Sequence, residues 1–331
     1  MTVTTPALRL ITLLAIGFVT VLSAQADTGI DAFENGDFAG ARTALEERIA
    51  SNAKDAEAYI YLGRTLMNLD DAKAAADALD TAIELAPDSA AAHAHRGEAY
   101  GTLAGNASAF KAGKLARKTR KAFERALEID PNQLTALNGL IQYKLVAPRL
   151  MGGNKKEALE LTDRLIAIDE FDGTLRKSAV LQSLERETEA VAALTSLTER
   201  YPKDPRAHYQ LGFFHQSAKD YEQAAKSFAL AGATTVDNQD QAVARAQAWY
   251  QLGRTAVFSE QNVPAGIDAL SEYLKFDGLT PEMPGKDWAH YRLGELLSLN
   301  GDEAAAQTNF ASAMNLTEDK NLKRRVKDRL N

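Results

Sequence analysis

The stretch YIYLGRTLMNLDDAKAAADALDTAIELAP, residues 59–87, decides the fold of this chain. Its frame is set by Gly63, with Tyr59 four residues before it, Leu62 one before, and Leu66, Ala75, Leu79, Ala82 and Pro87 at three, twelve, sixteen, nineteen and twenty-four after. Small residues stand where two helices must touch, large residues stand between them, and a proline follows the second helix. This order predicts a helix–turn–helix unit.

The same frame recurs further along the chain at three other glycines. It fits Gly212 with His208, Leu211, His215, Ala224, Phe228 and Ala231, and it fits Gly294 with His290, Leu293, Leu297, Ala306, Phe310 and Ala313. Gly253 carries Trp249 and Leu252 in front and, after a slip of one residue, Gly266, Leu270 and Tyr273. The segments are rich in strong helix formers, and no alternating strand pattern of useful length occurs. The sequence therefore predicts an all-α repeat protein.

This pattern resembles the tetratricopeptide repeat family, over nearly the whole chain after residue 26. The resemblance implies a right-handed superhelical solenoid of about seven to eight stacked helix pairs over residues 27–331. The last stretch, residues 319–330, places Leu322, Val326 and Leu330 at intervals of four among basic residues. We expect a capping helix with one apolar stripe there.

Composition excludes several functional classes. The net charge of −7 gives no reason to expect non-specific nucleic-acid binding. Cysteine is absent, so no disulfide, thiol nucleophile or thiolate metal site exists.

Residues 1–26 have the features of an export signal. Arg9 supplies the positive start, Leu10 to Leu22 is an apolar run too short for an ordinary membrane span, and Ala24-Gln25-Ala26 offers small residues to a signal peptidase. We expect cleavage after Ala26 and an exported, periplasmic protein without a transmembrane segment in its mature chain. The alternative is an uncleaved anchor.

Two segments depart from the repeat frame. The repeat centred on Gly97 carries extra length between Gly101 and Thr119, and the following repeat has an enlarged turn at residues 146–153, which contains Pro148 and Gly153. Gly-Gly permits backbone angles that other residues avoid, and exposed loops often carry binding residues. This loop is either a binding element or a spacer that reorients the second helix.

One face of each first helix should line the concave surface of the stack. At about 100° per residue, positions three before, one after and four after the repeat glycine point away from the partner helix. They hold Ile60, Arg64 and Met67; Ala94, Glu98 and Gly101; Tyr209, Phe213 and Gln216; Tyr250, Arg254 and Val257; and Tyr291, Glu295 and Ser298. Aromatic residues and arginine are common anchors in peptide recognition. The candidates for partner binding are Arg64, Asn68, Tyr209, Phe213, Tyr250, Arg254 and Tyr291.

Two interpretations of these candidates remain open. The tyrosines either contact a partner or cover neighbouring helices as part of the scaffold, because tyrosine is common at this place in the family. Arg64 and Asn68 do not reproduce the paired lysines and asparagines of the two-carboxylate clamp found in chaperone-binding members.

A basic run occupies the insertion of the third repeat. It comprises Lys111, Lys114, Arg117, Lys118, Arg120 and Lys121, with no acid among them. We expect all six side chains to face water. The run is either a site for an anionic partner, such as lipid head groups, an acidic polymer or an acidic protein tail, or a solvated face balanced by acidic neighbours.

No catalytic grouping is found. His93, His208, His290 and His215 occupy packed positions of the frame, and no zinc-protease, nucleophile-elbow or phosphate-loop motif occurs. We therefore predict no enzyme activity, no cofactor and no metal.

The sequence favours a non-enzymatic interaction scaffold of the cell envelope that binds a peptide or helix of a protein partner in its concave groove. The first alternative is an accessory ligand-binding subunit for small-molecule uptake or envelope polymer handling. The second is a non-catalytic domain of an envelope enzyme complex.

Overall fold

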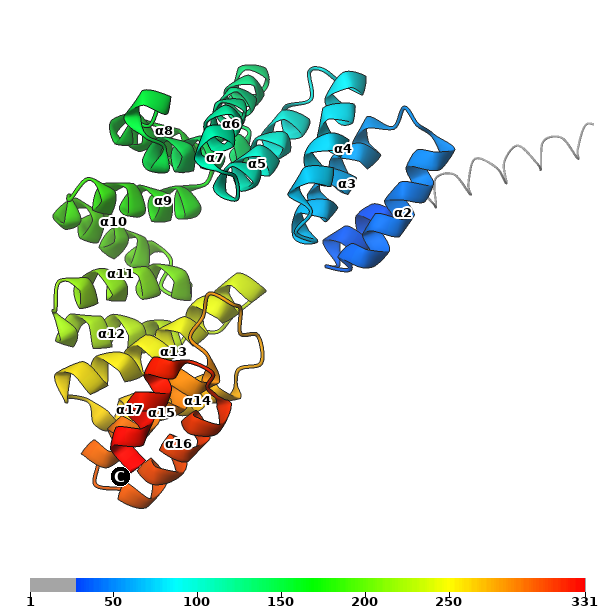
Figure 1. Ribbon diagram of the computed structural model, residues 1–331. Coiled ribbons are helices and arrows are strands. Elements are labelled where there is room, and N and C mark those ends of the chain that lie inside the picture. The colour runs from blue at the N-terminus through cyan, green and yellow to red at the C-terminus, as the bar shows by residue number, and fades with distance from the viewer. Residues whose placement is uncertain (1–27, 331) are drawn as a thin grey trace, which may run out of the picture. The chain divides into compact units, whose positions relative to one another are not determined.

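The computed structural model describes residues 28–330, and regular structure in that span is helical throughout (Figure 1). Helices that follow one another in sequence pack together in pairs, and within each part of the chain neighbouring pairs also pack together, as α4 does on α5 and α12 on α13. The all-α repeat fold expected from the sequence is confirmed. The predicted export signal lies outside the described residues. The chain divides into two compact units, one ending at Gly173 and the other beginning at Thr174.

Unit 1 opens with a helix at residues 28–34 and continues through α8. The bounds of its elements are α2 (Phe38–Ser51), α3 (Ala56–Asn68), α4 (Ala72–Leu85), α5 (Ala90–Gly105), α6 (Ala109–Ile129), α7 (Leu134–Val146), the short 3-10 helix η1 (Arg149–Met151) and α8 (Lys155–Ile168). The unit boundary falls inside α9 (Glu170–Ser183).

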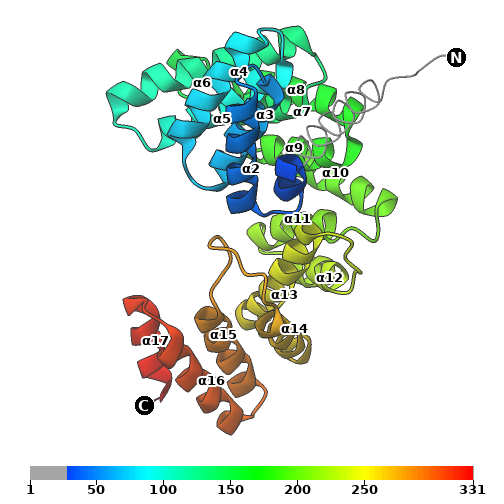
Figure 2. The same ribbon diagram turned by 90° about the vertical axis from the view of Figure 1, so that its right-hand side faces the viewer.

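Unit 2 contains the remaining helices of the described chain. They are α10 (Glu187–Arg200), α11 (Pro205–Ser217), α12 (Tyr221–Gly232), α13 (Gln239–Ser259), α14 (Val263–Lys275), α15 (Lys286–Leu299), α16 (Glu303–Leu316) and α17 (Lys320–Leu330). The last three lie next to one another (Figure 2). The terminal helix α17 packs on α16 through Leu322 and Val326, whose side chains are fully buried.

Aspartates define where many of the helices begin. Asp55 accepts a hydrogen bond from the backbone N–H of Ala58 at 3.0 Å, and Asp71 caps α4 in the same way. Asp220 and Asp302 repeat this arrangement at α12 and α16. Each cap satisfies one backbone donor that the first turn of a helix leaves unpaired.

The repeat glycines are small because the second helix of the pair lies against them. A Cβ atom added to Gly63 would lie 2.5 Å from Cγ of Leu79, and one added to Gly294 would lie 2.6 Å from the ring of Phe310. Both large side chains are buried. The close contact inferred from the sequence frame is therefore present.

The residue seven positions after the repeat glycine turns the chain from the first helix into the second. It has left-handed backbone geometry in five glycine-centred repeats: Gly36, Asp70, Lys219, Glu260 and Gly301, with φ of 78°, 59°, 61°, 55° and 84°. The repeats centred on Gly97 and Ile141 lack this turn, because α5 continues to Gly105 and α7 leads into the η1 loop. These two repeats surround the site described below.

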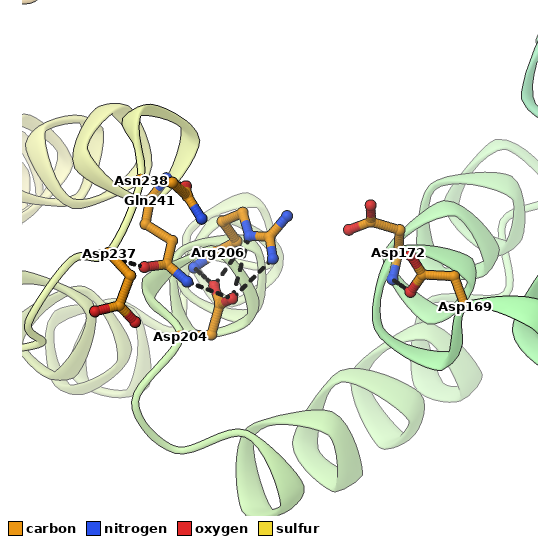
Figure 3. A network of polar contacts seen from close by, with 7 residues as sticks. All are labelled: Asp169, Asp172, Asp204, Arg206, Asp237, Asn238 and Gln241. Atoms are coloured by element: carbon orange, nitrogen blue, oxygen red, sulfur yellow. Dashed lines mark hydrogen bonds and ion pairs between the residues drawn. The ribbon is translucent and has the colours of Figure 1, made fainter. Parts of the chain in front are cut away.

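A polar cluster in unit 2 joins consecutive repeats (Figure 3). Asp204 caps α11 by accepting from the backbone N–H of Arg206 at 2.9 Å and pairs with the Arg206 guanidinium at 2.8 Å. Gln241, in the first turn of α13, donates from Nε2 to Asp204 at 3.2 Å. Burial raises the pKa of Asp204, but the hydrogen bonds from Arg206 and Gln241 outweigh burial, and its pKa lies below its ordinary value.

Candidate functional site: an apolar groove in unit 1

A groove of about 970 Å³ lies in unit 1 between α3, α5, α6 and α7. Small residues on α5 and α6 create much of the space: Gly97, Gly101, Gly105, Ala112, Gly113 and Ala116. The three glycines of α5 follow one another at intervals of four, so they share one face of the helix. That spacing is the sign of the groove that the sequence contains.

Phe123 of α6 fixes how closely the walls of the groove approach each other. Its ring is buried, and a Cβ atom added to Gly97 or Gly139 would lie only 2.5 Å or 2.2 Å from ring atoms. Glycine on both α5 and α7 therefore lets the ring pack between these helices. Phe123 also lines the groove itself.

Two of the residues predicted to bind a partner, Arg64 and Asn68, line this groove. The guanidinium of Arg64 lies over the rings of Phe33 and Tyr61, with its carbon 4.3 Å and 4.7 Å from their centroids. Asn68 donates from Nδ2 to the backbone carbonyl of Arg64 at 3.0 Å. No ion pair joins Arg64 to a carboxylate in residues 28–330. The arginine is thus held by aromatic stacking and keeps its donors for another group.

The wall formed by α5 contributes a second polar pair. His95 and Glu98 line the groove, and Nδ1 of His95 lies 2.7 Å from Oε2 of Glu98. Because Glu98 is exposed, this contact leaves the carboxylate accessible to a bound molecule. The groove therefore combines an apolar floor with a cation and an anion at separate points.

The enlarged turn at residues 146–153 supplies another wall, through Pro148 and Met151. The hydroxyl of Tyr143 donates to the backbone carbonyl of Met151 at 2.7 Å, and burial raises the pKa of Tyr143. Gly152 is left-handed, with φ of 96°, and a Cβ atom on Gly153 would lie 1.8 Å from the carbonyl oxygen of Ala147. The two glycines thus have a structural role, and they position residues that line the groove.

The base of this loop is tied to α8. The backbone N–H of Asn154 donates to the carbonyl of Lys144 at 2.8 Å, and the ammonium of Lys144 pairs with Glu157. The hydrogen bond from Lys144 lowers the pKa of Glu157. These contacts give the loop a defined position beside the groove.

Two of the three unit 2 tyrosines considered for partner binding are buried. Tyr250 and Tyr291 are 6% and 3% exposed, and their rings contact Tyr273 and Phe310 at centroid distances of 5.3 Å and 5.8 Å. Both aromatic partners lie on the second helix of the same pair, Tyr273 on α14 and Phe310 on α16. The long side chain at this offset therefore reaches the partner helix, although its angle on the first helix points away from it. The scaffold interpretation is favoured for both residues.

The other candidates in unit 2 are partly buried. Tyr209 contacts Phe228 with ring centroids 6.1 Å apart, Phe213 packs against the same cluster, and the Arg254 guanidinium lies 5.1 Å from the ring centroid of Phe258. Unlike Arg64, none of them lines the groove of unit 1.

The basic run lies on α6, and its members differ in exposure. Lys111, Lys114, Arg117 and Lys121 are exposed, as expected. The exposed Lys118 donates to the hydroxyl of Tyr100 at 3.2 Å. Arg120 differs from the expectation that all six face water, because the η1 loop lies against it: a Cβ atom on Gly152 would be 3.4 Å from Cδ of Arg120. Arg120 is partly buried and pairs with Glu124 at 3.5 Å.

Two of the five histidines are buried where one repeat joins the next. His93 and His208 are buried, and Nε2 of each lies within hydrogen-bond distance of a proline carbonyl, 2.9 Å from Pro87 and 3.1 Å from Pro202. Burial lowers the pKa of His93. In the described part of the chain, no group of three or more histidine, aspartate or glutamate side chains could hold a metal ion. No helix among the described residues is both long and apolar enough to span a bilayer.

A family model for the tetratricopeptide repeat matches residues 27–90 and 180–238. In these two segments the chain is similar to the tetratricopeptide repeat family. No curated protein matches its sequence. The segment between the two matched regions holds α6, α7 and the η1 loop, so most of the groove is built where the chain departs from the family pattern.

Solved structures support the fold. A thermophilic tetratricopeptide repeat protein of Thermus thermophilus is 18% identical, with a TM-score of 0.50 over 58% of this chain and 98% of its own. Yeast Tom70 is 15% identical, with a TM-score of 0.62 over 88% of this chain and 57% of its own. A chain of the APC/C hetero-tetramer Cut9–Hcn1 is similar at 15% identity, with a TM-score of 0.50 over 89% of this chain and 53% of its own. At these identities the likeness concerns the fold alone.

Proposed function

We propose that this protein is a non-enzymatic scaffold of the cell envelope that binds a segment of a protein partner in the groove of unit 1. Tetratricopeptide repeats generally form protein–protein interaction scaffolds, and the model of that family matches two segments of this chain. The observation that carries the proposal is the groove itself, with small residues along α5 and α6 and the stacked guanidinium of Arg64 at its side.

The groove suits a polypeptide for two reasons. Glycine and alanine on its floor let the backbone or a bulky apolar side chain of a ligand approach closely. Arg64 offers several donors in a fixed plane, which suit a carboxylate or backbone carbonyls, while Glu98 can accept from N–H groups. A bound segment should therefore carry apolar side chains toward α5 and α6 and an acidic or carbonyl group toward Arg64.

The second candidate function is an accessory ligand-binding subunit. A volume of about 970 Å³ lies within the usual range of small-molecule pockets, about 300 to 1,000 Å³, and the floor is apolar. The same groove would then hold a small amphiphile. Small molecules extracted from the purified protein and identified by mass spectrometry would support this function over peptide binding.

A matched pair of arginine variants tests the groove. Arg64 and Arg254 occupy the same position of their repeats, one residue after the glycine, but only Arg64 lines the groove. Partner capture from envelope extracts should fall with Arg64→Gln and stay unchanged with Arg254→Gln. Equal capture by both variants and the wild type would contradict the proposed site.

Filling the groove gives an independent test. A Cβ atom on Gly101 would meet only the Thr119 side chain, at 3.7 Å or more, so Gly101→Leu should fold while occupying the space. Val257→Leu enlarges the equivalent position in unit 2 and serves as the control. We expect Gly101→Leu to abolish capture and Val257→Leu to preserve it.

The envelope location rests on residues 1–26 and is tested separately. Mass spectrometry of protein recovered from the envelope fraction should find Asp27 at the N-terminus. A retained Met1 would support the uncleaved anchor, and recovery only from the cytoplasm would refute export.

A further inference from the structure

The exposed side of α6 carries an apolar residue in line with three cations. Phe110, Lys114, Arg117 and Lys121 are spaced four, three and four residues apart, so they share one face of the helix. All four are exposed, and Phe110 is 94% exposed. An exposed single apolar residue is ordinary on a protein surface, but this one continues into a second element.

The η1 loop lies beside this helix. It packs on α6: a Cβ atom on Gly113 would lie 3.5 Å from the Met151 methyl group. The loop presents Arg149, which is exposed, and Leu150, which is 102% exposed. We call Phe110, Lys114, Arg117, Lys121, Arg149 and Leu150 the α6–η1 surface.

The cations of this surface have no carboxylate partner. Within residues 28–330, none of Lys114, Arg117, Lys121 or Arg149 forms an ion pair, whereas nearby Arg120 pairs with Glu124. The protein as a whole has a net charge of −7. At physiological salt, charges more than about 8 to 10 Å from this surface are screened, so its own positive charges govern what approaches it.

We propose that the α6–η1 surface docks on an anionic lipid surface. The four cations contact headgroup phosphates, and Phe110 and Leu150 enter the boundary between headgroups and acyl chains. Neither apolar side chain lines the groove, so neither is explained by a segment bound there. An acidic polymer or acidic protein tail would engage the cations and leave Phe110 and Leu150 in water; a lipid surface accommodates both kinds of side chain.

Vesicle co-sedimentation tests the proposal, using the chain from Asp27 onward, whose residues 28–330 form the helices described. It should bind vesicles containing phosphatidylglycerol and not vesicles of phosphatidylcholine alone, and binding should weaken as salt is raised. The triple variant Lys114→Gln, Arg117→Gln, Lys121→Gln should bind on the order of a hundred-fold more weakly, since each cation near an anionic leaflet contributes roughly five-fold. A control with Lys54→Gln, Lys203→Gln and Lys327→Gln removes the same charge elsewhere and should bind like the wild type.

The apolar pair separates lipid from other anionic partners. Phe110→Ser with Leu150→Ser should weaken vesicle binding roughly ten-fold or more at every salt concentration, because apolar area no longer leaves water. Helical circular dichroism should be unchanged in all variants.

No binding to phosphatidylglycerol vesicles at low salt would overturn the proposal. Polyglutamate binding that needs the cations, together with vesicle binding indifferent to Phe110 and Leu150, would also overturn it in favour of an acidic polymer. Arg64→Gln should bind vesicles normally, which keeps this test separate from that of the groove.

Discussion

One position of the repeat carries a large aromatic side chain in unit 2 and a small side chain in part of unit 1. Three residues before the repeat glycine, unit 2 has Tyr209, Tyr250 and Tyr291, whose rings contact other aromatic rings between the helices. The corresponding residues of unit 1 include Ile60 and Ala94.

Further along the same helices the difference continues. Four residues after the glycine, unit 2 has Gln216, Val257 and Ser298, whereas α5 of unit 1 has Gly101. Unit 1 has a groove of about 970 Å³ along α5. Of these two positions only the second borders the groove on α5: Gly101 lines it, whereas Ala94 is fully buried. One backbone frame thus accommodates an open groove where the residue four after the glycine of α5 is small.

The largest effect should come from emptying the filled positions. Tyr250→Ala removes a ring that is 6% exposed and contacts Tyr273, so we expect unit 2 to lose about 3 to 5 kcal/mol of unfolding free energy. Chemical denaturation followed by circular dichroism measures the loss. Met67→Ala, at a partly exposed position in the groove, should lose far less. A similar small loss for both variants would mean that Tyr250 does not support the scaffold as we infer.

The packing of Phe123 should be the next most sensitive feature. Gly139→Ala places a methyl group 2.2 Å from a ring atom of Phe123, and overpacking of this kind costs about 1 to 3 kcal/mol. Thermal unfolding should show a lower midpoint. Since Phe123 lines the groove, partner capture by Gly139→Ala should fall as well. An unchanged unfolding midpoint would show that α5 and α7 can separate freely.

Substitution of Gly101, which lies on α5, should change stability in the opposite direction to substitution of Gly139. A Cβ atom on Gly101 has only an ordinary contact, 3.7 Å from the Thr119 methyl group. Alanine is favoured over glycine inside a helix by about 0.5 to 1 kcal/mol, so Gly101→Ala should raise stability by that amount. Denaturant titration of this variant beside Gly97→Ala, which meets Phe123 at 2.5 Å, compares the two positions directly. Destabilisation by both would show that the groove is closed in solution.

The sequence was sufficient for the repeat frame and insufficient for its exceptions. Contacts such as Gly63 with Leu79 follow from fixed offsets within one helix pair, and pairs of helices are local structure. Burial of Tyr250 and Tyr291 does not follow from their angle on the first helix, because their long side chains still reach Tyr273 and Phe310 on the second helix of the same pair. The left-handed turns at Lys219 and Glu260 carry no glycine signal either.

The groove was predictable only in part. Arg64 was found from its helix face, Asn68 was named beside it in the comparison with the two-carboxylate clamp, and the insertions beside them were visible as departures from the frame. The volume was not predictable, because it depends on how the long helices α5 and α6 and the η1 loop pack together. The spacing of Gly97, Gly101 and Gly105 was the one local sign of a face without side chains.

The smallest effect concerns Asp204, whose polar contacts join two consecutive repeats of unit 2. The pKa of Asp204 is lowered in the folded protein, because its hydrogen bonds outweigh burial. A carboxyl group with a lowered pKa contributes stability that is fully present above the ordinary aspartate value of 3.8 and is lost as the pH falls through the lower folded value.

We expect Asp204→Asn to lose about 1 kcal/mol of unfolding free energy at neutral pH, since the ion pair with Arg206 is lost while the amide oxygen can still cap α11. Urea titrations of the wild type and the variant at neutral pH and at successively lower pH should show this difference shrinking below about pH 4. A difference that stayed constant with pH would mean that the ionised carboxylate of Asp204 does not stabilise the junction of α11 and α13.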